Sequence, residues 1–341
     1  MKRAFLGQRS LALAVTLIEP RNTAVTVAVR RCFGAHQGSC CKRFAVHIDR
    51  YLANRTLCVQ TRTTEIVMAT KRVGVVTGAG SGIGRAVAKR LAAAGNRVVV
   101  ADVHEAAGRA VVDEITKSGG DAMFHFVDVA SEASVDLLAN DVERQCGATG
   151  VLVNSAGVLQ NVSAIDSFSL EEHDRLWAIN YRGTYLCCRA FAPRMVWRRT
   201  GSIVNISSTS AVDAMPLLAY GPSKAAIDNL TAILAVELGP DNVRVNAVRP
   251  GYVLTEQMQT RIAAGKRDPK TMKEHSALGR LVAPVDVANA IHFLCSEEAS
   301  CITGIVLPVD AGYLAAVTYL HHPGLAGVHP RRTASARGTK S

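Results

Sequence analysis

Residues 77–84 have the sequence Thr77-Gly78-Ala79-Gly80-Ser81-Gly82-Ile83-Gly84 and join an apolar run at 72–77 to a helical pattern at 83–94. Glycine lets a backbone turn tightly and approach a pyrophosphate without interference from Cβ. The start of the following helix offers free N–H groups and the positive end of the helix dipole. A plain strand–helix turn would also contain glycines, but this strand–turn–helix context favours a dinucleotide-binding turn.

Outward from this turn, short apolar runs alternate with helical patterns. The runs are apolar at nearly every position and lie at 72–77, 97–102, 123–129, 150–155, 202–207, 243–248 and 304–309. Such runs are typical of parallel strands that are buried on both faces. We therefore predict an α/β fold, a single Rossmann-like doubly wound domain with a seven-stranded parallel sheet.

The charge of the chain is concentrated at its two ends. Residues 1–68 contain 11 Lys/Arg against three acids, and residues 317–341 contain four Lys/Arg and no acid, so the part between is nearly neutral although the chain carries +11. Nucleic-acid binding needs a basic face on a folded domain, and we expect none. We predict a basic N-terminal extension at 1–68, disordered or absent from the mature protein, a catalytic domain at 69–315, and a basic, disordered tail at 316–341.

The extension leaves three interpretations open. Translation starting at Met68 is the one we favour, an Arg-rich, acid-poor organelle-targeting peptide is the second, and a functional arm is the third.

No apolar run reaches the ~18–20 residues that span a bilayer, so we expect no membrane segment. The nine cysteines include no C-x-x-C pair, which predicts no metal site and is typical of a reducing, cytoplasmic compartment. Adjacent Cys187 and Cys188 fit two buried small residues better than a disulfide.

Asp102 indicates which cofactor the turn binds. It closes the second strand, where a carboxylate can accept hydrogen bonds from a ribose 2′-OH and would repel a 2′-phosphate. The next residue is Val103 rather than Arg, and Ser81 is not basic, so we expect NAD(H) rather than NADP(H). An N-cap of the next helix is the alternative role for Asp102. Asp128-Val129, which ends the third predicted strand, and Asn154, which ends the fourth, are further candidates beside the cofactor.

Tyr220 and Lys224 are the candidates for chemistry, since a spacing of four places them on one face of a helix. A free tyrosine titrates near 10, and a neighbouring ammonium would favour its phenolate. A tyrosine and a lysine four residues apart occur often by chance, so this spacing alone would indicate only a solvated helix face. Other motifs accompany it: Ser207-Ser208 at a strand end, Asn180 after the helical stretch 171–179, and Pro250-Gly251 followed by Thr255. Together with the glycine turn, these motifs resemble the short-chain dehydrogenase/reductase family over residues 69–315.

The resemblance implies a role for each matching residue. Tyr220 would be the general acid/base, Lys224 would hold the nicotinamide ribose and lower the tyrosine pKa, and Asn180 would anchor a water in a proton relay. The cofactor NAD would be bound by Thr77, Gly78, Gly80, Ser81, Gly82, Ile83, Gly84, Asp102, Asp128, Val129, Asn154, Ala156, Gly157, Tyr220, Lys224, Pro250, Gly251, Val253 and Thr255. Alignment on the strand end selects Ser208 as the serine that holds the substrate oxygen, whereas the usual spacing to tyrosine selects Ser207. We choose Ser208.

The predicted function is reversible hydride transfer between NAD(H) and a secondary alcohol or ketone of small size. An NADPH-linked 3-oxoacyl-thioester reductase of the same family and a non-catalytic NAD-sensing regulator are the alternatives. The substrate loop should be about 252–281, and its basic residues are explained better by a solvated face than by an anionic substrate. The family also implies a homo-oligomer, a tetramer or dimer, formed through helices at 170–197 and 220–238.

Overall fold

The computed structural model describes residues 12–18, 24–30 and 71–320, and the chain divides into two units at Ala69/Thr70. In the first unit, β1 (Ala12–Ile18) pairs antiparallel with β2 (Ala24–Arg30). These strands are regular structure within an extension for which the sequence predicted disorder. The rest of that extension lies outside the described residues.

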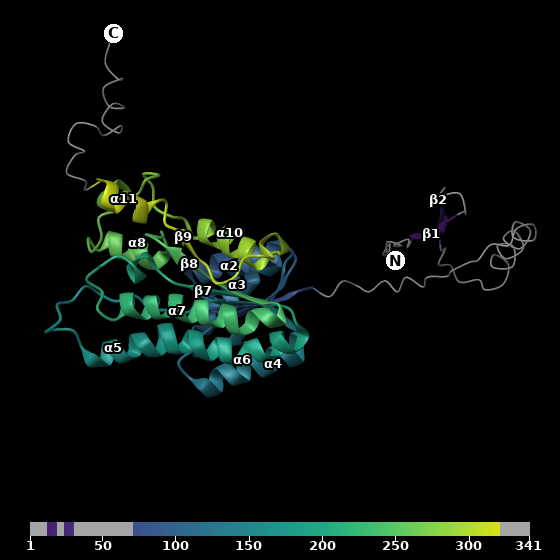
Figure 1. The fold of residues 1–341 in the computed structure, drawn as a ribbon, viewed down its shortest axis with the longest axis horizontal. Helices are drawn as coiled ribbons and strands as arrows, with labels where there is room; N and C mark the ends of the chain where they lie inside the picture. Colours follow the sequence, from purple (N-terminus) through teal and green to yellow (C-terminus); the bar gives the residue numbers. More distant parts are fainter. Residues whose placement is uncertain (1–11, 19–23, 31–70, 321–341) are drawn as a thin grey trace, which may run out of the picture. The chain divides into compact units, whose positions relative to one another are not determined.

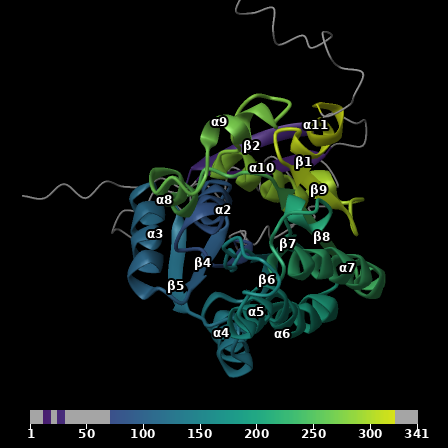
Figure 2. The same cartoon turned by 90° about the vertical axis from the view of Figure 1, so that its left-hand side faces the viewer.

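The second unit is built on a seven-stranded sheet in which every neighbouring pair is parallel. The strands are β3 (Val73–Thr77), β4 (Arg97–Asp102), β5 (Asp121–Phe126), β6 (Thr149–Asn154), β7 (Gly201–Ile206), β8 (Val243–Pro250) and β9 (Val306–Val309). Their order is β5-β4-β3-β6-β7-β8-β9 (Figure 2). The predicted doubly wound fold is confirmed. The order reverses between β3 and β6, and ligands of such sheets bind at that switch point, outside the carboxyl ends of the strands.

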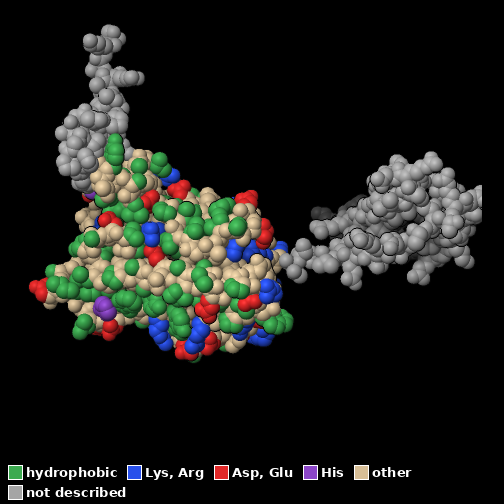
Figure 3. All heavy atoms as spheres, in the orientation of Figure 1, with side chains coloured by type: hydrophobic (Ala, Val, Ile, Leu, Met, Phe, Trp, Pro, Cys, Tyr) green, Lys and Arg blue, Asp and Glu red, His purple; other side chains and the backbone are tan. Residues whose placement is uncertain are grey.

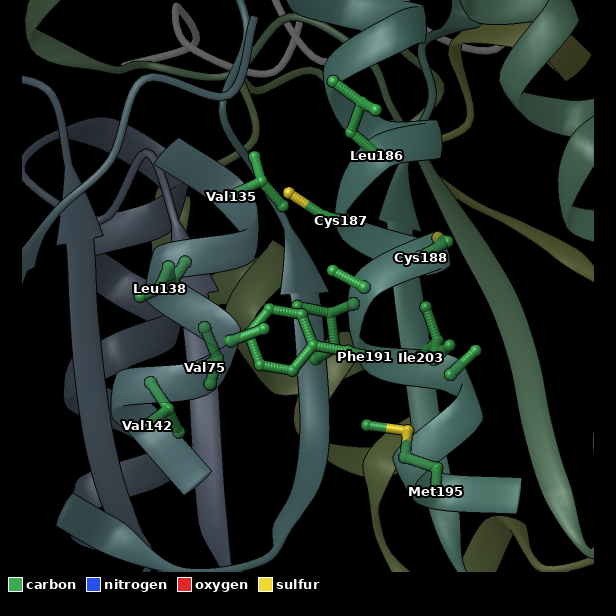
Figure 4. Close-up of a cluster of buried hydrophobic side chains, with 14 of the residues drawn as sticks. Val75, Val135, Leu138, Val142, Leu186, Cys187, Cys188, Phe191, Met195 and Ile203 are labelled. Atoms are coloured by element: carbon green, nitrogen blue, oxygen red, sulfur yellow. The ribbon is translucent and has the colours of Figure 1, made fainter. Parts of the chain in front are cut away.

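Helices cover both faces of the sheet (Figure 1). One layer contains α2 (Gly82–Ala93), α3 (Glu105–Lys117) and α10 (Pro284–Cys295), and the other contains α4 (Glu132–Cys146), α6 (Gly183–Arg198) and α7 (Tyr220–Leu238). Alternate β3 residues face opposite layers: Val75 packs in the α4–α6 cluster and Val76 packs in the α2–α10 cluster. Phe191 and Cys187 of α6 point into the first cluster (Figure 4). The adjacent cysteines are buried, as expected.

Shorter elements lie around the carboxyl ends of the strands and at the chain's turns. They are α5 (Leu170–Trp177), a π-helical turn η1 (Ala178–Arg182), the 3-10 turns η2 (Thr209–Ala211), η3 (Gly239–Asp241) and η4 (Glu297–Ala299), α8 (Glu256–Ala263), α9 (Pro269–Glu274) and α11 (Tyr313–Leu320). Helix α11 extends beyond residue 315, where the sequence predicted the tail to begin. No helix in the described part of the chain has the length and apolar character needed to cross a membrane.

Strand β5 differs from its prediction in position and burial. It ends at Phe126, so Asp128 and Val129 lie in the following loop rather than on the strand. No residue of β5 is fully buried, because β5 is an edge strand with a neighbour on one side only. An apolar run alone does not distinguish an edge strand from a central one.

Candidate active site

A cleft of about 550 Å³ opens at the switch point. Its volume is in the range of small-molecule sites. Most of the residues predicted to bind the cofactor or to react line it: Gly78, Ser81, Gly82, Ile83, Gly84, Asp102, Asp128, Val129, Ala156, Gly157, Ser208, Tyr220, Lys224, Pro250, Gly251, Val253 and Thr255. Residues separated by 177 positions in the sequence therefore meet at one edge of the sheet.

The glycine turn is packed too closely for side chains. A Cβ on Gly84 would lie 2.1 Å from the Gly78 carbonyl oxygen, and one on Gly78, whose φ is +63°, would lie 2.6 Å from Cα of Ala156. Thr77 fixes this approach, because its Oγ1 accepts hydrogen bonds from the N–H groups of Ser155 and Ala156, both at 3.2 Å. The turn thus leaves open backbone at the start of α2, as a bound pyrophosphate requires.

Asp102 is 7% exposed and has structural partners as well as a place in the cleft. Oδ2 accepts from the Gly80 N–H at 2.8 Å, and Oδ1 accepts from the His104 N–H at 2.8 Å. The carboxylate therefore ties the glycine turn to His104. His104 is the N-cap of α3, so Asp102 does not have the N-cap role that was the alternative. Each carboxylate oxygen has a second lone pair and can also accept from a ribose hydroxyl.

Three predicted cofactor residues do not line the cleft: Thr77, Gly80 and Asn154. Asn154 is 2% exposed, and its Nδ2 donates to Oδ1 of Asn205 at 2.9 Å. The expectation that Asn154 lies beside the cofactor is therefore not met by its side chain, which joins β6 to β7 behind the cleft. At the end of a buried strand, side chains alternate between the two faces, and only the register decides which face a residue meets.

Lys224 lies one helical turn after Tyr220, the first residue of α7. Its Nζ is 5.6 Å from the centroid of the Tyr220 ring and donates to the Ile206 carbonyl at 2.8 Å. The side chain is 4% exposed. Burial lowers the pKa of Lys224 from 10.5 to about 8, and the charge of Asp228 opposes that shift. The ammonium is thus a desolvated donor at the floor of the cleft.

The two serines at the end of β7 have different surroundings. Ser207 is 1% exposed, and its Oγ donates to the Lys224 carbonyl at 3.4 Å. Ser208 Oγ accepts from the N–H and the hydroxyl of Ser210 at 3.2 and 3.0 Å. Burial raises the pKa of the Tyr220 hydroxyl, whereas its hydrogen bond with Ser208 and the charge of Arg261 lower it. Ser208, rather than Ser207, therefore faces the Tyr220 hydroxyl.

Asn180 lies in the π-helical turn η1 and is fully buried. Oδ1 accepts from the Val158 N–H at 2.8 Å, and Nδ2 donates to the Val158 carbonyl at 3.1 Å. A Cβ on Gly157 would be 3.2 Å from this Oδ1 and 3.7 Å from Lys224 Nζ, so both groups adjoin one glycine. The amide holds the loop after β6 against the lysine. Single π turns occur frequently at functional sites.

The segment predicted as the substrate loop is closed at its base and contacts the glycine turn. Val253 bridges to Val282, and the Leu254 N–H donates to the Val282 carbonyl at 2.8 Å. Glu256, the first residue of α8, was not singled out in the sequence. Its carboxylate accepts from the Gly82 N–H at 3.0 Å and pairs with Arg85 at 3.3 Å. The start of α8 therefore lies over the start of α2.

Gln160 is a second site residue that the sequence did not indicate. It is 1% exposed, and its Oε1 accepts from the N–H groups of Ala219 and Tyr220 at 2.9 and 3.0 Å. These are unpaired donors at the start of α7, so Gln160 positions the helix end that contains the tyrosine. A contact across about 60 residues has no signature in the sequence pattern.

Comparison with known proteins identifies relatives over most of the second unit. A family model described as enoyl-(acyl carrier protein) reductase matches residues 78–314. A Bradyrhizobium diazoefficiens protein named "Probable short-chain type dehydrogenase/reductase" is 39% identical over 250 residues, which are 72% of this chain and 88% of the relative.

Two solved structures have the same fold. One, described as ribose-5-phosphate isomerase from Brucella melitensis 16M, is 44% identical, with TM-score 0.70, and the match covers 74% of this chain and 95% of that one. The other is a 7α-hydroxysteroid dehydrogenase in complex with NADH and 7-oxo glycochenodeoxycholic acid; it is 34% identical, with TM-score 0.67 and 71% and 93% coverage. The activities in these names differ although the fold is shared, so activity has to be argued from the site.

Proposed function

The chain belongs to the short-chain dehydrogenase/reductase family of oxidoreductases, and from this premise we propose that it transfers hydride between NAD(H) and a secondary alcohol or ketone. The observation that carries the proposal is the convergence of Tyr220, Ser208 and Lys224 on a cleft that begins at the glycine turn. A sensor that only binds a dinucleotide has no need of a tyrosine hydroxyl bonded to a serine.

The residues present fit a nicotinamide dinucleotide. The backbone at Gly78 and Gly84 is close-packed and free of side chains, and the N-terminus of α2 lines the cleft, where a helix start favours a pyrophosphate. The Glu256 carboxylate accepts from the first N–H of α2, that of Gly82, so a pyrophosphate bound there would displace it. When bound, the nicotinamide ring accepts or donates the hydride. Asp102 supports NAD(H) over NADP(H), because a 2′-phosphate at its carboxylate would place two negative charges together.

In the direction of reduction, the Tyr220 hydroxyl donates its proton to the substrate oxygen, and Ser208 holds that oxygen by a hydrogen bond. Tyr220 then regains a proton from solvent. Lys224 stabilises the transient phenolate, since its Nζ lies 5.6 Å from the ring centroid. Lys224 is buried and Tyr220 is half-buried, and partial exclusion of water strengthens these interactions.

Initial rates of NADH and NADPH oxidation with a panel of neutral ketones and 3-oxoacyl thioesters test the proposal. We expect ketone reduction with NADH, a strong loss in Ser208→Ala, and a smaller loss in Ser207→Ala. Turnover of thioesters alone, with NADPH, would support the thioester-reductase alternative. Tight NAD binding without any turnover would instead support a regulator.

We also propose that the protein assembles as a dimer or tetramer through α6 and α7. Trp197 of α6 is 81% exposed, and Val236 and Ile233 of α7 are 79% and 53% exposed. Figure 3 shows hydrophobic side chains on the face where these helices lie. A second copy of the chain would remove this apolar surface from water.

A further inference from the structure

Gln160 has a buried donor that the fold does not use. Its Oε1 accepts the two N–H groups at the start of α7, whereas its Nε2 is buried and has no hydrogen-bond partner. A buried N–H group without a partner is unfavourable, because it has lost its hydrogen bond to water and gained none in return. Residues 155–159, directly before Gln160, line the cleft. The free donor therefore lies where the loop after β6 meets the N-terminus of α7, beside Tyr220.

Arg261 approaches the same place from α8. Its Nη1 donates to the Gln160 carbonyl at 3.4 Å. Gln257 and Met258, which line the cleft, precede Arg261 by four and three residues and share its face of the helix. Arg261 also lies near enough to Tyr220 for its charge to lower the pKa of that hydroxyl. The guanidinium and the Gln160 amide thus adjoin the proton donor from two elements.

The positive charge at this place has no acidic partner. Within residues 71–320, no ion pair includes Arg261 or Arg267. Burial and then the charge of Arg267 lower the pKa of Arg261. The neighbouring carboxylate, Asp268, accepts from the N–H groups of Lys270 and Thr271 at the start of α9. Two cations close together without a counter-ion favour an anionic ligand.

We propose that Gln160 Nε2 and the Arg261 guanidinium bind a carboxylate of the substrate, so that the ketone is an oxo acid and the alcohol a hydroxy acid. This inference rests on the proposed hydride transfer and names the substrate class at the same site. Carboxylates accept from guanidinium and amide donors in a planar arrangement, which would satisfy the free Nε2 and neutralise Arg261.

Matched pairs of acid and ester test the inference. The probes are pyruvate, acetoacetate and levulinate, which differ in the spacing between ketone and carboxylate, and the methyl ester of each. Cyclohexanone is the neutral reference. We expect kcat/KM with NADH to be at least about ten-fold higher for one of these acids than for its ester, as expected for a charge-assisted hydrogen bond.

Two variants should reduce this acid-to-ester ratio towards one. Arg261→Gln removes the charge. Gln160→Glu keeps an oxygen that can accept from Ala219 and Tyr220 but replaces the Nε2 donor by a second acceptor. The ratio separates loss of carboxylate binding from a general loss of catalysis, which would affect both substrates alike. Lys266→Gln is the matched control, because it removes an exposed charge from the same segment and should leave the ratio unchanged.

A ratio of one or less for all three acids in the unsubstituted protein would overturn the inference, and so would an unchanged ratio in Arg261→Gln. If cyclohexanone and the esters are reduced, such a result leaves the proposed function standing. If no ketone is reduced at all, the proposed function fails. Isothermal titration of the same acids into the unsubstituted protein and Arg261→Gln, both with NAD, then decides the inference: equal binding contradicts it, and weaker binding to the variant supports it.

Discussion

Lys224→Met should slow the reaction strongly but make the folded protein more stable at neutral pH. The folded protein holds an ammonium that is 4% exposed, and burial lowers its pKa from 10.5 to about 8. At 1.36 kcal/mol per pKa unit, this difference corresponds to roughly 3 kcal/mol of destabilisation when the group is charged in both states, below pH 8. Losing the hydrogen bond to the Ile206 carbonyl costs about 1 kcal/mol. At pH 7 the free energy of unfolding of Lys224→Met should therefore exceed that of the unsubstituted protein by roughly 2 kcal/mol.

The sign of the pH dependence follows from the depressed pKa. Between about pH 8 and 10.5, the unfolded chain keeps the Lys224 proton while the folded chain releases it, so the free energy of unfolding rises with pH. The advantage of Lys224→Met should therefore shrink from pH 8 and disappear by pH 10.5. Urea unfolding followed by far-UV circular dichroism, at one fixed protein concentration, measures the difference.

Lys117→Met is the matched control, since Lys117 is an exposed lysine at the end of α3. The difference in free energy of unfolding between Lys117→Met and the unsubstituted protein should not change with pH. A Lys224→Met gain that is the same at pH 7 and pH 10, or a loss at pH 7, would refute the reasoning that a desolvated ammonium is held in the cleft. The NADH-linked rate of Lys224→Met should fall by about 10²-fold or more.

Four further outcomes are expected. Tyr220→Phe should reduce kcat by about 10²–10⁴-fold without unfolding, because Ser208 keeps its Ser210 partners; a rate above a tenth of the original would require another acid. NAD(H) should bind at least about ten-fold more tightly than NADP(H) in fluorescence titrations. Asp102→Ala should reduce the difference in affinity between the two cofactors and also weaken the binding of NAD(H), since the hydrogen bond from the Gly80 N–H is lost. Equal affinities for NAD(H) and NADP(H) in the unsubstituted protein would contradict the expected preference. A chain that begins at Met68 should fold and keep full activity, because the described core begins at Lys71; insoluble protein would show that the extension is needed. Val236→Asp should reduce the molar mass seen by light scattering at micromolar concentration, and an unsubstituted protein that is already a monomer would exclude the α6–α7 interface.

The sequence by itself determined the features that depend on neighbouring residues. Continuous apolar runs predicted the seven parallel strands, and the turn from Gly78 to Gly84 located the first βα unit. The four-residue spacing of Tyr220 and Lys224 placed both on one side of α7, which begins at Tyr220. These predictions succeeded because the periods of helices and strands, and the backbone freedom of glycine, act over a few residues.

Tertiary structure decided everything that depends on register or on distant partners. Ser207 and Ser208 both follow a strand. The Ser207 N–H still bonds to the Val248 carbonyl of β8, whereas Ser208 caps the turn η2, where its hydroxyl meets that of Tyr220. The register of β6 and β7 places Asn154 opposite Asn205, so its side chain bonds to that residue and does not line the cleft. Gln160 and Arg261, 101 residues apart, meet because α8 folds over the end of the sheet. Such contacts leave no period in the sequence, since loop closure brings together residues whose local patterns are independent.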